Sequence, residues 1–489
     1  MSTLDLLVIG AGFAGLGAAL TAAENGARVG LFEALAYPGG CASTFQRNGA
    51  RFEAGATLFA GLGPEQLFGR WIAAHGMPVE VDWIDPLVTL RAPGLDLPLL
   101  RDRAAVIERL AADSSKGPAI RAFFAEQGAL ADGLWDLLND PSLLPPFSAG
   151  SLLRHVGRLP ATLGALRWVG SPLRAMLNRH GLGDEPRLRL LLDALCQITV
   201  QCGADEAEAP FALGAIDYLW RGTGHVRGGI GVLAQGLVGA IRAQGGQVSL
   251  ADRVLHLRRE ADGGWLVTTR KGEQRARRVI STLHPRAMAA LLPEEARPAS
   301  LERLSARLDE GWGAVMLYRV LRPAHLPEMA HHLQLIADPA RPLVEGNHLF
   351  ASTSGRLDGD RSPPGTVTMT ASTHLSLRTL REAADPGALV AAVQERMRQT
   401  LAARAPELGE VVLEMTASPR TWARFVRRPE GAVGGVPRRA GLDHYTQLGP
   451  LSLGAGLDLA GDAVFPGQSI LAAAIGGSRA VVRSLSLRR

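Results

Sequence analysis

The stretch that most restricts how this chain can fold lies near its N-terminus, where residues 4–33 read LDLLVIGAGFAGLGAALTAAENGARVGLFE. An apolar run is followed by a G-x-G-x-x-G turn, a helix of small residues and a second apolar run that ends in an acid. The three glycines permit a tight turn, close approach of a pyrophosphate and close packing of the helix on a sheet. The helix N-terminus favours phosphate, and an acid about twenty residues further on can accept hydrogen bonds from a ribose. This unit predicts a Rossmann-like dinucleotide-binding domain of α/β class. Its predicted site residues are Gly10, Gly12, Phe13, Ala14, Gly15, Glu33 and Ala34.

A second glycine-containing stretch follows at residues 37–59, YPGGCASTFQRNGARFEAGATLF. Its Pro-Gly-Gly turn brings backbone beside the cofactor, and the Gly-Ala-Thr step offers a second approach through small residues. A nicotinamide dinucleotide needs neither, whereas a flavin, with its ribityl chain and broad ring, needs backbone along its whole length. The stretch therefore favours FAD as the cofactor. Its predicted contacts are Gly39, Gly40, Cys41, Gly55, Ala56 and Thr57.

The C-terminal part contains LDLAGDAVFPGQSILAAAIGG, residues 457–477. Apolar packing alone requires neither the Gly-Asp pair after a strand-like run nor the Pro-Gly turn that opens a helix of small residues. Together, the three stretches resemble the flavin amine oxidase and phytoene desaturase superfamily. Its members share the dinucleotide motif, a Gly-Gly turn after the ribose acid and a C-terminal Gly-Asp. The resemblance covers about the first 65 residues, 225–285 and 450–480.

This resemblance implies further contacts to FAD. The Gly-Asp pair would meet the ribityl and pyrophosphate part, the Gln-Ser-Ile step would lie near the flavin ring, and a strand valine would lend its backbone to the adenine. A helix N-terminus behind the ring can stabilise negative charge on a reduced flavin. Cys41 stands where desaturases often carry arginine, and we interpret it as a small space-filler. The residues implied are Val254, Gly461, Asp462, Gln468, Ser469 and Ile470.

Within the superfamily, residues 38–59 and the C-terminal stretch look most like the branch of carotenoid isomerases, retinol saturases and late carotenoid desaturases. The resemblance implies an FAD-dependent oxidoreductase that acts on CH–CH bonds and introduces a C=C bond into a carotenoid or related polyene. No second G-x-G-x-x-G provides a nicotinamide site, so the electrons are expected to pass to a quinone or to oxygen. The close alternative is cis–trans isomerisation or saturation of a polyene with reduced flavin.

Two other functions remain open. A flavin amine or porphyrinogen oxidase is favoured less, because amine oxidases orient their substrate with aromatic rings and none of the four tyrosines lies in the C-terminal flavin segment. A pigment-binding protein without catalysis is the other. No catalytic residue is assigned. Glu53, Asp217 and His444 can serve as acid or base by their chemistry, but structural roles suit each of them better.

The cofactor-binding stretches are separated along the chain, so the FAD-binding domain is predicted to be discontinuous. Its three parts are residues 1–64, 222–290 and 441–489. The insert 65–221 is predicted to be helical and to face the substrate and the membrane. The insert 291–440 is predicted to form a substrate domain of mixed sheet plus helices.

Composition restricts the partners and the location. Only Lys116 and Lys271 are lysines among the 52 cations, and the arginines form no stripe beside aromatics, so nucleic acid is not an expected partner. The three cysteines have no metal-ligand spacing, and no metal is expected. The start shows no signal peptide and no run is long enough to span a bilayer, which predicts a cytoplasmic protein. Residues 141–183 contain five arginines and no acid, which favours peripheral attachment to a membrane surface.

Overall fold

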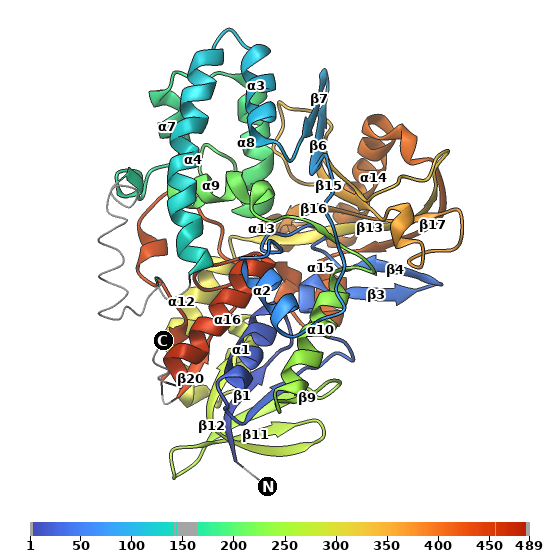
Figure 1. Cartoon of the computed structure of the whole chain (residues 1–489). Coiled ribbons are helices and arrows are strands. Elements are labelled where there is room, and N and C mark those ends of the chain that lie inside the picture. Colours follow the sequence, from blue (N-terminus) through green and yellow to red (C-terminus); the bar gives the residue numbers. More distant parts are fainter. Residues whose placement is uncertain (1–2, 141–142, 144–163, 455, 486–489) are drawn as a thin grey trace.

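Two mixed sheets and a layer of helices make up the computed structural model, which describes residues 3–140, 143, 164–454 and 456–485 (Figure 1). The first sheet, at the bottom of the view, has the strand order β10-β11-β12-β1-β2-β9, with β20 pairing with β12 and β19 with β20. Its bounds are β1 Leu4–Ile9, β2 Val29–Phe32, β9 Gln247–Ser249, β10 Val254–Arg259, β11 Trp265–Thr269, β12 Gly272–Ser281, β19 Leu451–Ser452 and β20 Leu457–Leu459. The centre is parallel, from β9 through β2, β1 and β12 to β20. Apolar runs such as VGLF of β2 form here because a parallel strand is covered on both faces.

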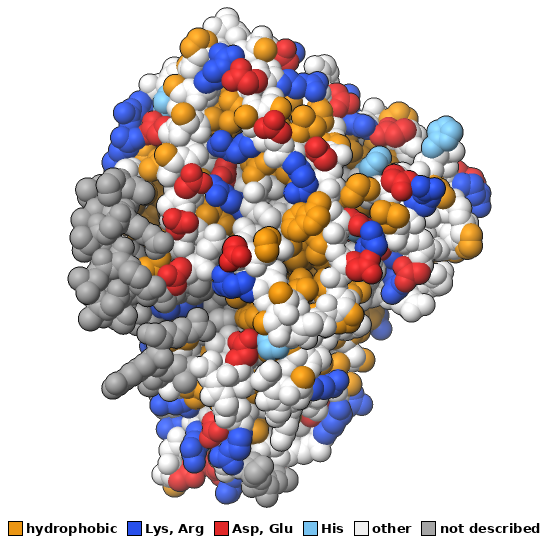
Figure 2. All heavy atoms as spheres, viewed as in Figure 1, with side chains coloured by type: hydrophobic (Ala, Val, Ile, Leu, Met, Phe, Trp, Pro, Cys, Tyr) orange, Lys and Arg blue, Asp and Glu red, His pale blue; other side chains and the backbone are white. Residues whose placement is uncertain are grey.

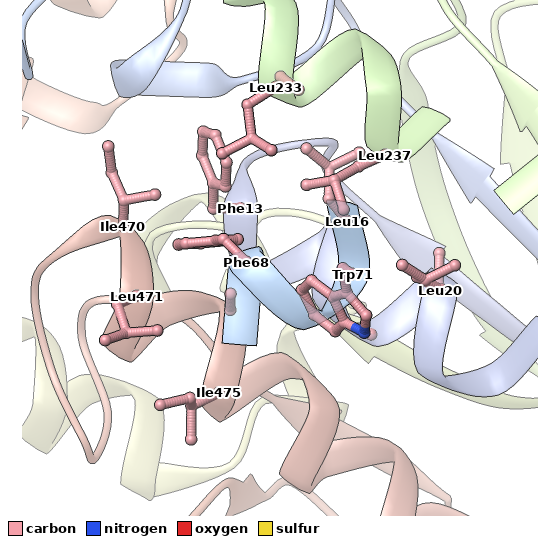
Figure 3. Packing of buried hydrophobic residues seen from close by; sticks show 14 of the residues in the cluster. Phe13, Leu16, Leu20, Phe68, Trp71, Leu233, Leu237, Ile470, Leu471 and Ile475 are labelled. Carbon is pink, nitrogen blue, oxygen red and sulfur yellow. The ribbon is translucent and has the colours of Figure 1, made fainter. Parts of the chain in front are cut away.

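Four helices pack over this sheet into one apolar core. They are α1 Phe13–Glu24, α2 Leu67–Ala74, α10 Ile230–Ala243 and α16 Ile470–Ser484. Side chains from all four helices converge in this core (Figure 3). Small residues let α1 and α16 approach closely, since a Cβ added at Gly477 would lie 1.9 Å from the carbonyl oxygen of Ala14. The N-terminal motif and the C-terminal stretch therefore lie side by side.

The second sheet has the order β17-β13-β16-β15-β14-β6-β7, with β18 pairing with β13. Its bounds are β6 Val88–Ala92, β7 Leu95–Leu99, β13 Trp312–Arg322, β14 His331–Ile336, β15 His348–Thr353, β16 Val367–Ser376, β17 Glu410–Ala417 and β18 Ala432–Val433. Helix α14, Pro386–Arg404, packs on it through Val393, Met397 and Leu401. The strands β6 and β7 belong to the insert 65–221, for which the sequence pattern predicted helices. Both inserts therefore contribute to this sheet.

A layer of helices stands beside the second sheet, at the top of Figure 1. These helices are α3 Arg103–Ala112, α4 Gly117–Asn139, α7 Leu173–Arg179, α8 Pro186–Thr199 and α9 Ala209–Ile216. They share an apolar core that includes Phe123, Leu192 and Leu213. The remaining elements are β3 Thr44–Arg47, β4 Ala50–Glu53, β5 Val81–Asp82, β8 His225–Val226, α11 Pro285–Ala289, α12 Ala299–Leu308, α13 Leu377–Glu382 and α15 Pro419–Phe425.

The surface carries mixed charges. Figure 2 shows acidic and basic side chains interspersed over the visible face, with hydrophobic side chains gathered near its middle. Among the residues that the structure describes, no helix is both long and apolar enough to cross a membrane.

Candidate cofactor and substrate site

A cavity of about 780 Å³ lies where the two sheets and the helical layer meet. Its lining comes from the β1–α1 turn, the strand-end residues 32–35, the turns at 39–42 and 55–59, and the start of α16. Opposite these, α4, α8, α9 and the second sheet supply further lining. Stretches more than four hundred residues apart in the sequence thus meet around one space.

The first turn of the cavity wall is built from glycines. Gly10 has a φ of +96°, which favours glycine, and a Cβ there would lie 2.7 Å from Thr282 Oγ1. A Cβ added at Gly12 would have no described atom within 4 Å, so a ligand can approach the backbone there. Gly15 does not line the cavity: its Cβ would lie 1.8 Å from the Gly10 carbonyl oxygen, and its role is close packing. Within the described chain no side chain caps α1, whose first N–H groups remain available to a phosphate.

Glu33 stands at the end of β2, on the cavity wall. Its carboxylate accepts hydrogen bonds from the backbone N–H of Ala11 at 2.7 Å and of Leu35 at 2.8 Å. Burial raises the pKa of this carboxyl above its ordinary value. Ala34 and Val254 line the same end of the cavity. The acid is held in place by backbone and faces the region predicted to take the adenosine.

The second turn lies directly against the first. Gly39 donates its N–H to the carbonyl of Ala11 at 2.8 Å, and a Cβ at Gly40 would lie 3.3 Å from the Cα of Gly12. The Gly-Ala-Thr step continues the wall, and a Cβ at Gly55 would lie 2.7 Å from the ring of Trp422. The predicted residues of this stretch that line the cavity are Gly39, Gly40, Cys41, Gly55, Ala56 and Thr57.

The C-terminal stretch closes the other side. Gly461 has a φ of +116°, and a Cβ added there would lie 3.9 Å from the Cβ of Ala14. Ser469 caps α16, its hydroxyl accepting from the N–H of Ala472 at 3.0 Å. The amide of Gln468 donates to the carbonyl of Thr199 at the end of α8. The implied residues that line the cavity here are Gly461, Asp462, Gln468, Ser469 and Ile470.

Sequence reasoning missed Arg428, which lines the cavity beside Asp462 at 2.9 Å. Burial lowers the pKa of its guanidinium, but Asp462 and Cys41 raise it more, so the net pKa is raised. At Cys41, by contrast, burial raises the pKa of the thiol, which agrees with a space-filling role. No local motif marks residue 428, whose position is set by contacts with segments far away in the sequence.

Arg438 is a second missed cation on the cavity wall. Its guanidinium stacks over the ring of Phe211 with 4.5 Å to the ring centroid, and burial lowers its pKa to about 10. The acid/base candidate His444 lies behind it, outside the lining. His444 Nδ1 accepts from Arg438 and Arg307, each at 3.1 Å, while Nε2 donates to the Arg439 carbonyl. This histidine orients arginines rather than substrate.

The other two acid/base candidates also have structural roles. Asp217 accepts a hydrogen bond from Arg103 Nε at 2.8 Å and is buried away from the cavity. Glu53 pairs with Arg361 at 3.2 Å and accepts from the hydroxyl of Thr44 at 2.8 Å. Neither lines the large cavity.

The wall away from the glycine turns is largely apolar. Its apolar side chains come from α4, α8, α9, the second sheet and neighbouring loops, and include Leu134, Trp135, Leu137, Leu138, Ile198, Val200, Phe211, Met316 and Phe350. Two histidines also line the cavity, His374 on β16 of the second sheet and His284 just after β12. Burial lowers the pKa of His284 to about 3 and that of His374 to about 4, so both are neutral near pH 7.

Most of the predicted membrane-facing segment lies outside the described residues, Arg154 and Arg158 included. In its described part, Arg167 and Arg179 both lie beside Glu126 and over the ring of Trp168. Trp168 is buried in the core of the helical layer. This part packs as a helical cap, and membrane attachment stays a prediction.

Glycine turns, an uncapped helix and a backbone-held acid thus lie together on the wall of one cavity. The family described as flavin containing amine oxidoreductase matches residues 13–483, and the chain belongs to that family. Its cofactor is FAD. The α/β fold class, the family and the cofactor predicted from the sequence are confirmed.

Relatives and solved structures agree with this assignment. Chloroplastic prolycopene isomerase of Arabidopsis thaliana is 25% identical over 506 residues, covering 97% of this chain and 82% of that protein. Hydroxyneurosporene desaturase of Rubrivivax gelatinosus is 30% identical over 263 residues, covering 50% of this chain and 46% of that protein. An oxidoreductase structure from Methanosarcina mazei has a TM-score of 0.66 at 19% identity, covering 96% of this chain and 98% of that one, which is a likeness of fold.

Proposed function

We propose that this protein is an FAD-dependent carotenoid desaturase, which introduces a C=C bond into a polyene. The observation that carries the proposal is the apolar wall of the cavity opposite the glycine turns. Side chains such as Trp135, Phe211 and Met316 offer a polyene apolar contact along its length, and the Arg438 guanidinium lies over the ring of Phe211. A long hydrocarbon has little polarity to grip, so its position must come from shape and apolar contact.

The residues of the protein contribute to this reaction by holding the cofactor and the polyene and by excluding water. When bound, FAD supplies a two-electron acceptor for a hydride equivalent. The glycine turns and Asp462 with Arg428 hold the cofactor, while the apolar wall holds the polyene and keeps water out. His284 and His374 stay neutral near pH 7 because burial lowers their pKa, so neither adds charge near the substrate.

The printed names of the relatives support the substrate class. They include prolycopene isomerases and a hydroxyneurosporene desaturase, and both names describe proteins that act on polyenes. We further propose a quinone or oxygen as the electron acceptor and a membrane surface as the place where the substrate is met.

Isomerisation is the second candidate. The alignment with prolycopene isomerase spans 97% of this chain, whereas that with the desaturase spans 50%. An isomerase would need reduced flavin and would leave the mass of the polyene unchanged.

The test incubates the holoenzyme with carotenoids in liposomes, once with a quinone or oxygen and once with chemically reduced flavin under anaerobic conditions. Desaturation predicts a red-shifted product, lighter by two hydrogens, that forms only with the oxidant. A product of unchanged mass that forms only with reduced flavin would replace desaturation by isomerisation. Hydrogen peroxide released with amines or porphyrinogens, and no change in any polyene, would contradict both.

A further inference from the structure

Thr57 lies on the wall between the large cavity and a second, much smaller one of about 10 Å³. That volume is about the least that holds one water molecule. The small cavity lies between the β4 end and the second sheet. Its lining is Glu53, Thr57, His225, His332, Ser352, Thr353, Ser354, Arg361, Thr368 and Thr370. Every one of these side chains is polar, in contrast to the apolar wall of the large cavity.

Three of these residues form an unbroken chain of hydrogen bonds. Ser352 Oγ donates to Thr57 Oγ1 at 2.7 Å, and His332 Nδ1 lies 2.7 Å from Ser352 Oγ. The three residues are 8%, 7% and 3% exposed for Thr57, Ser352 and His332, so bulk water does not compete for these bonds. A hydroxyl both donates and accepts, and either ring nitrogen of a neutral imidazole can carry the proton. The chain can therefore run in both directions, from imidazole to cavity or from cavity to imidazole.

The imidazole of His332, at the far end of this hydrogen-bond chain, can accept one more hydrogen-bond partner. His332 Nε2 is buried and has no hydrogen-bond partner among the described residues, and its ring lines the small cavity. A water in that cavity would bond to it and reach the charged groups across the space. His225 bonds to Asp358 at 2.8 Å, and Arg361 lies 3.3 Å from Asp358.

The charges around His332 decide how it handles a proton. Burial lowers its pKa most, and His225, His331 and Arg361 lower it further. Glu53 and Asp358 supply the compensating negative charge on the other side of the small cavity. The imidazole of His332 is therefore held neutral, with a proton on one ring nitrogen and a free acceptor on the other.

Desaturation needs such a route, and in this respect the inference rests on the proposed function. Two hydrogens leave neighbouring carbons as the C=C bond forms: one departs with its electron pair to FAD, and the other departs as a proton. On the cavity wall, the imidazoles of His284 and His374 are weak acceptors for that proton, because burial lowers their pKa to about 3 and about 4. We propose that Thr57, Ser352 and His332 carry protons between the large cavity and the buried Asp358–His225 pair, and that this pair exchanges them with solvent.

The test follows proton uptake without any polyene, because FAD that is reduced takes up protons whatever the substrate. Holoenzyme is photoreduced in weakly buffered solution with a pH-indicator dye, and the rate of dye change is measured in H₂O and D₂O. We expect Ser352→Ala to slow proton uptake at least tenfold, and Thr57→Val to do the same at the other link. Ser352→Thr keeps a hydroxyl and should restore most of the rate.

The matched control is Ser305→Ala in α12, which removes a buried hydroxyl that lines neither cavity and donates to the Leu301 carbonyl. It should leave proton uptake unchanged. Equal rates for wild type and Ser352→Ala, or equal slowing by Ser305→Ala, would overturn the route and indicate that solvent enters the large cavity directly. Failure of the proposed desaturation would be seen in a different measurement. In that case no polyene reduces the flavin of the wild-type protein, although photoreduction of the flavin is still followed by proton uptake.

Discussion

Adding one methyl group where α1 meets α16 should damage both the fold and the cofactor site. A Cβ at Gly477 would lie 1.9 Å from the carbonyl oxygen of Ala14, and both partners are backbone in helices. To bring that contact to 3.0 Å, the two helices must separate by about 1.1 Å. Overpacking of this kind costs about 1–3 kcal/mol. The higher helix propensity of alanine returns up to about 1 kcal/mol. We expect Gly477→Ala to lower the free energy of unfolding by up to about 2 kcal/mol, the difference between the upper values of these two effects.

The cofactor should respond as well, because Ala14 and the first residues of α16 line the cavity. The matched control is Gly239→Ala in α10, where a Cβ would meet nothing within 4 Å. This variant should be neutral or more stable by about 0.4–1 kcal/mol. Urea unfolding of both variants, together with FAD content after gel filtration, is the assay. Equal stability and FAD content in the two variants would refute the close packing of α1 on α16.

Four other predictions concern the cofactor, pH and the membrane. Glu33→Gln should weaken FAD binding by about 1–3 kcal/mol, because a charged acceptor is lost; an unchanged Kd in titrations of the apoprotein would remove Glu33 from the site. Acid precipitation should release the flavin into solution, since the attachment is predicted to be noncovalent; yellow colour in the pellet counts against this. Burial, then Arg438 and Arg307, lower the folded pKa of His444 from 6.5 to about 4, so its contribution to stability is complete above pH 6.5 and is lost as the pH falls toward 4. His444→Gln should flatten the stability curve in that window, and an unaltered slope would exclude this group. Flotation with anionic liposomes should carry the protein upward and weaken in high salt; replacing Arg154, Arg158 and Arg167 by Gln should abolish it, and unchanged flotation assigns the segment to an internal cap.

The parts of the site that the sequence predicted are those governed by local rules. Gly10, Gly12 and Gly461 are required by backbone conformation and close approach, and such demands leave a signature in the sequence itself. The apolar strand–helix–strand pattern likewise predicted the first sheet. For Gly15, the third glycine of the motif, the sequence predicted close packing, and a Cβ there would indeed lie 1.8 Å from the Gly10 carbonyl oxygen.

The parts that were not predicted depend on contacts between distant segments. Arg428 comes to Asp462 from another part of the chain, and no spacing rule connects the two. Thr57 was predicted as a cofactor contact, yet its partner Ser352 lies 295 residues away and stands on a strand that the sequence pattern did not link to it. The β6–β7 hairpin was missed because its short alternating runs were read within a helical insert. Tertiary pairing outweighs local pattern in all three cases.

The central claim, that bound FAD takes electrons from a polyene, is tested most directly by an anaerobic single-turnover measurement. Oxidised holoenzyme is mixed with excess carotenoid in liposomes without any other acceptor, and flavin absorbance and carotenoid mass are followed together. The account predicts that the flavin band bleaches and that one polyene loses two hydrogens for each flavin reduced. An oxidised flavin that stays unbleached with every polyene tried, while reduced holoenzyme isomerises or hydrogenates them, would contradict it.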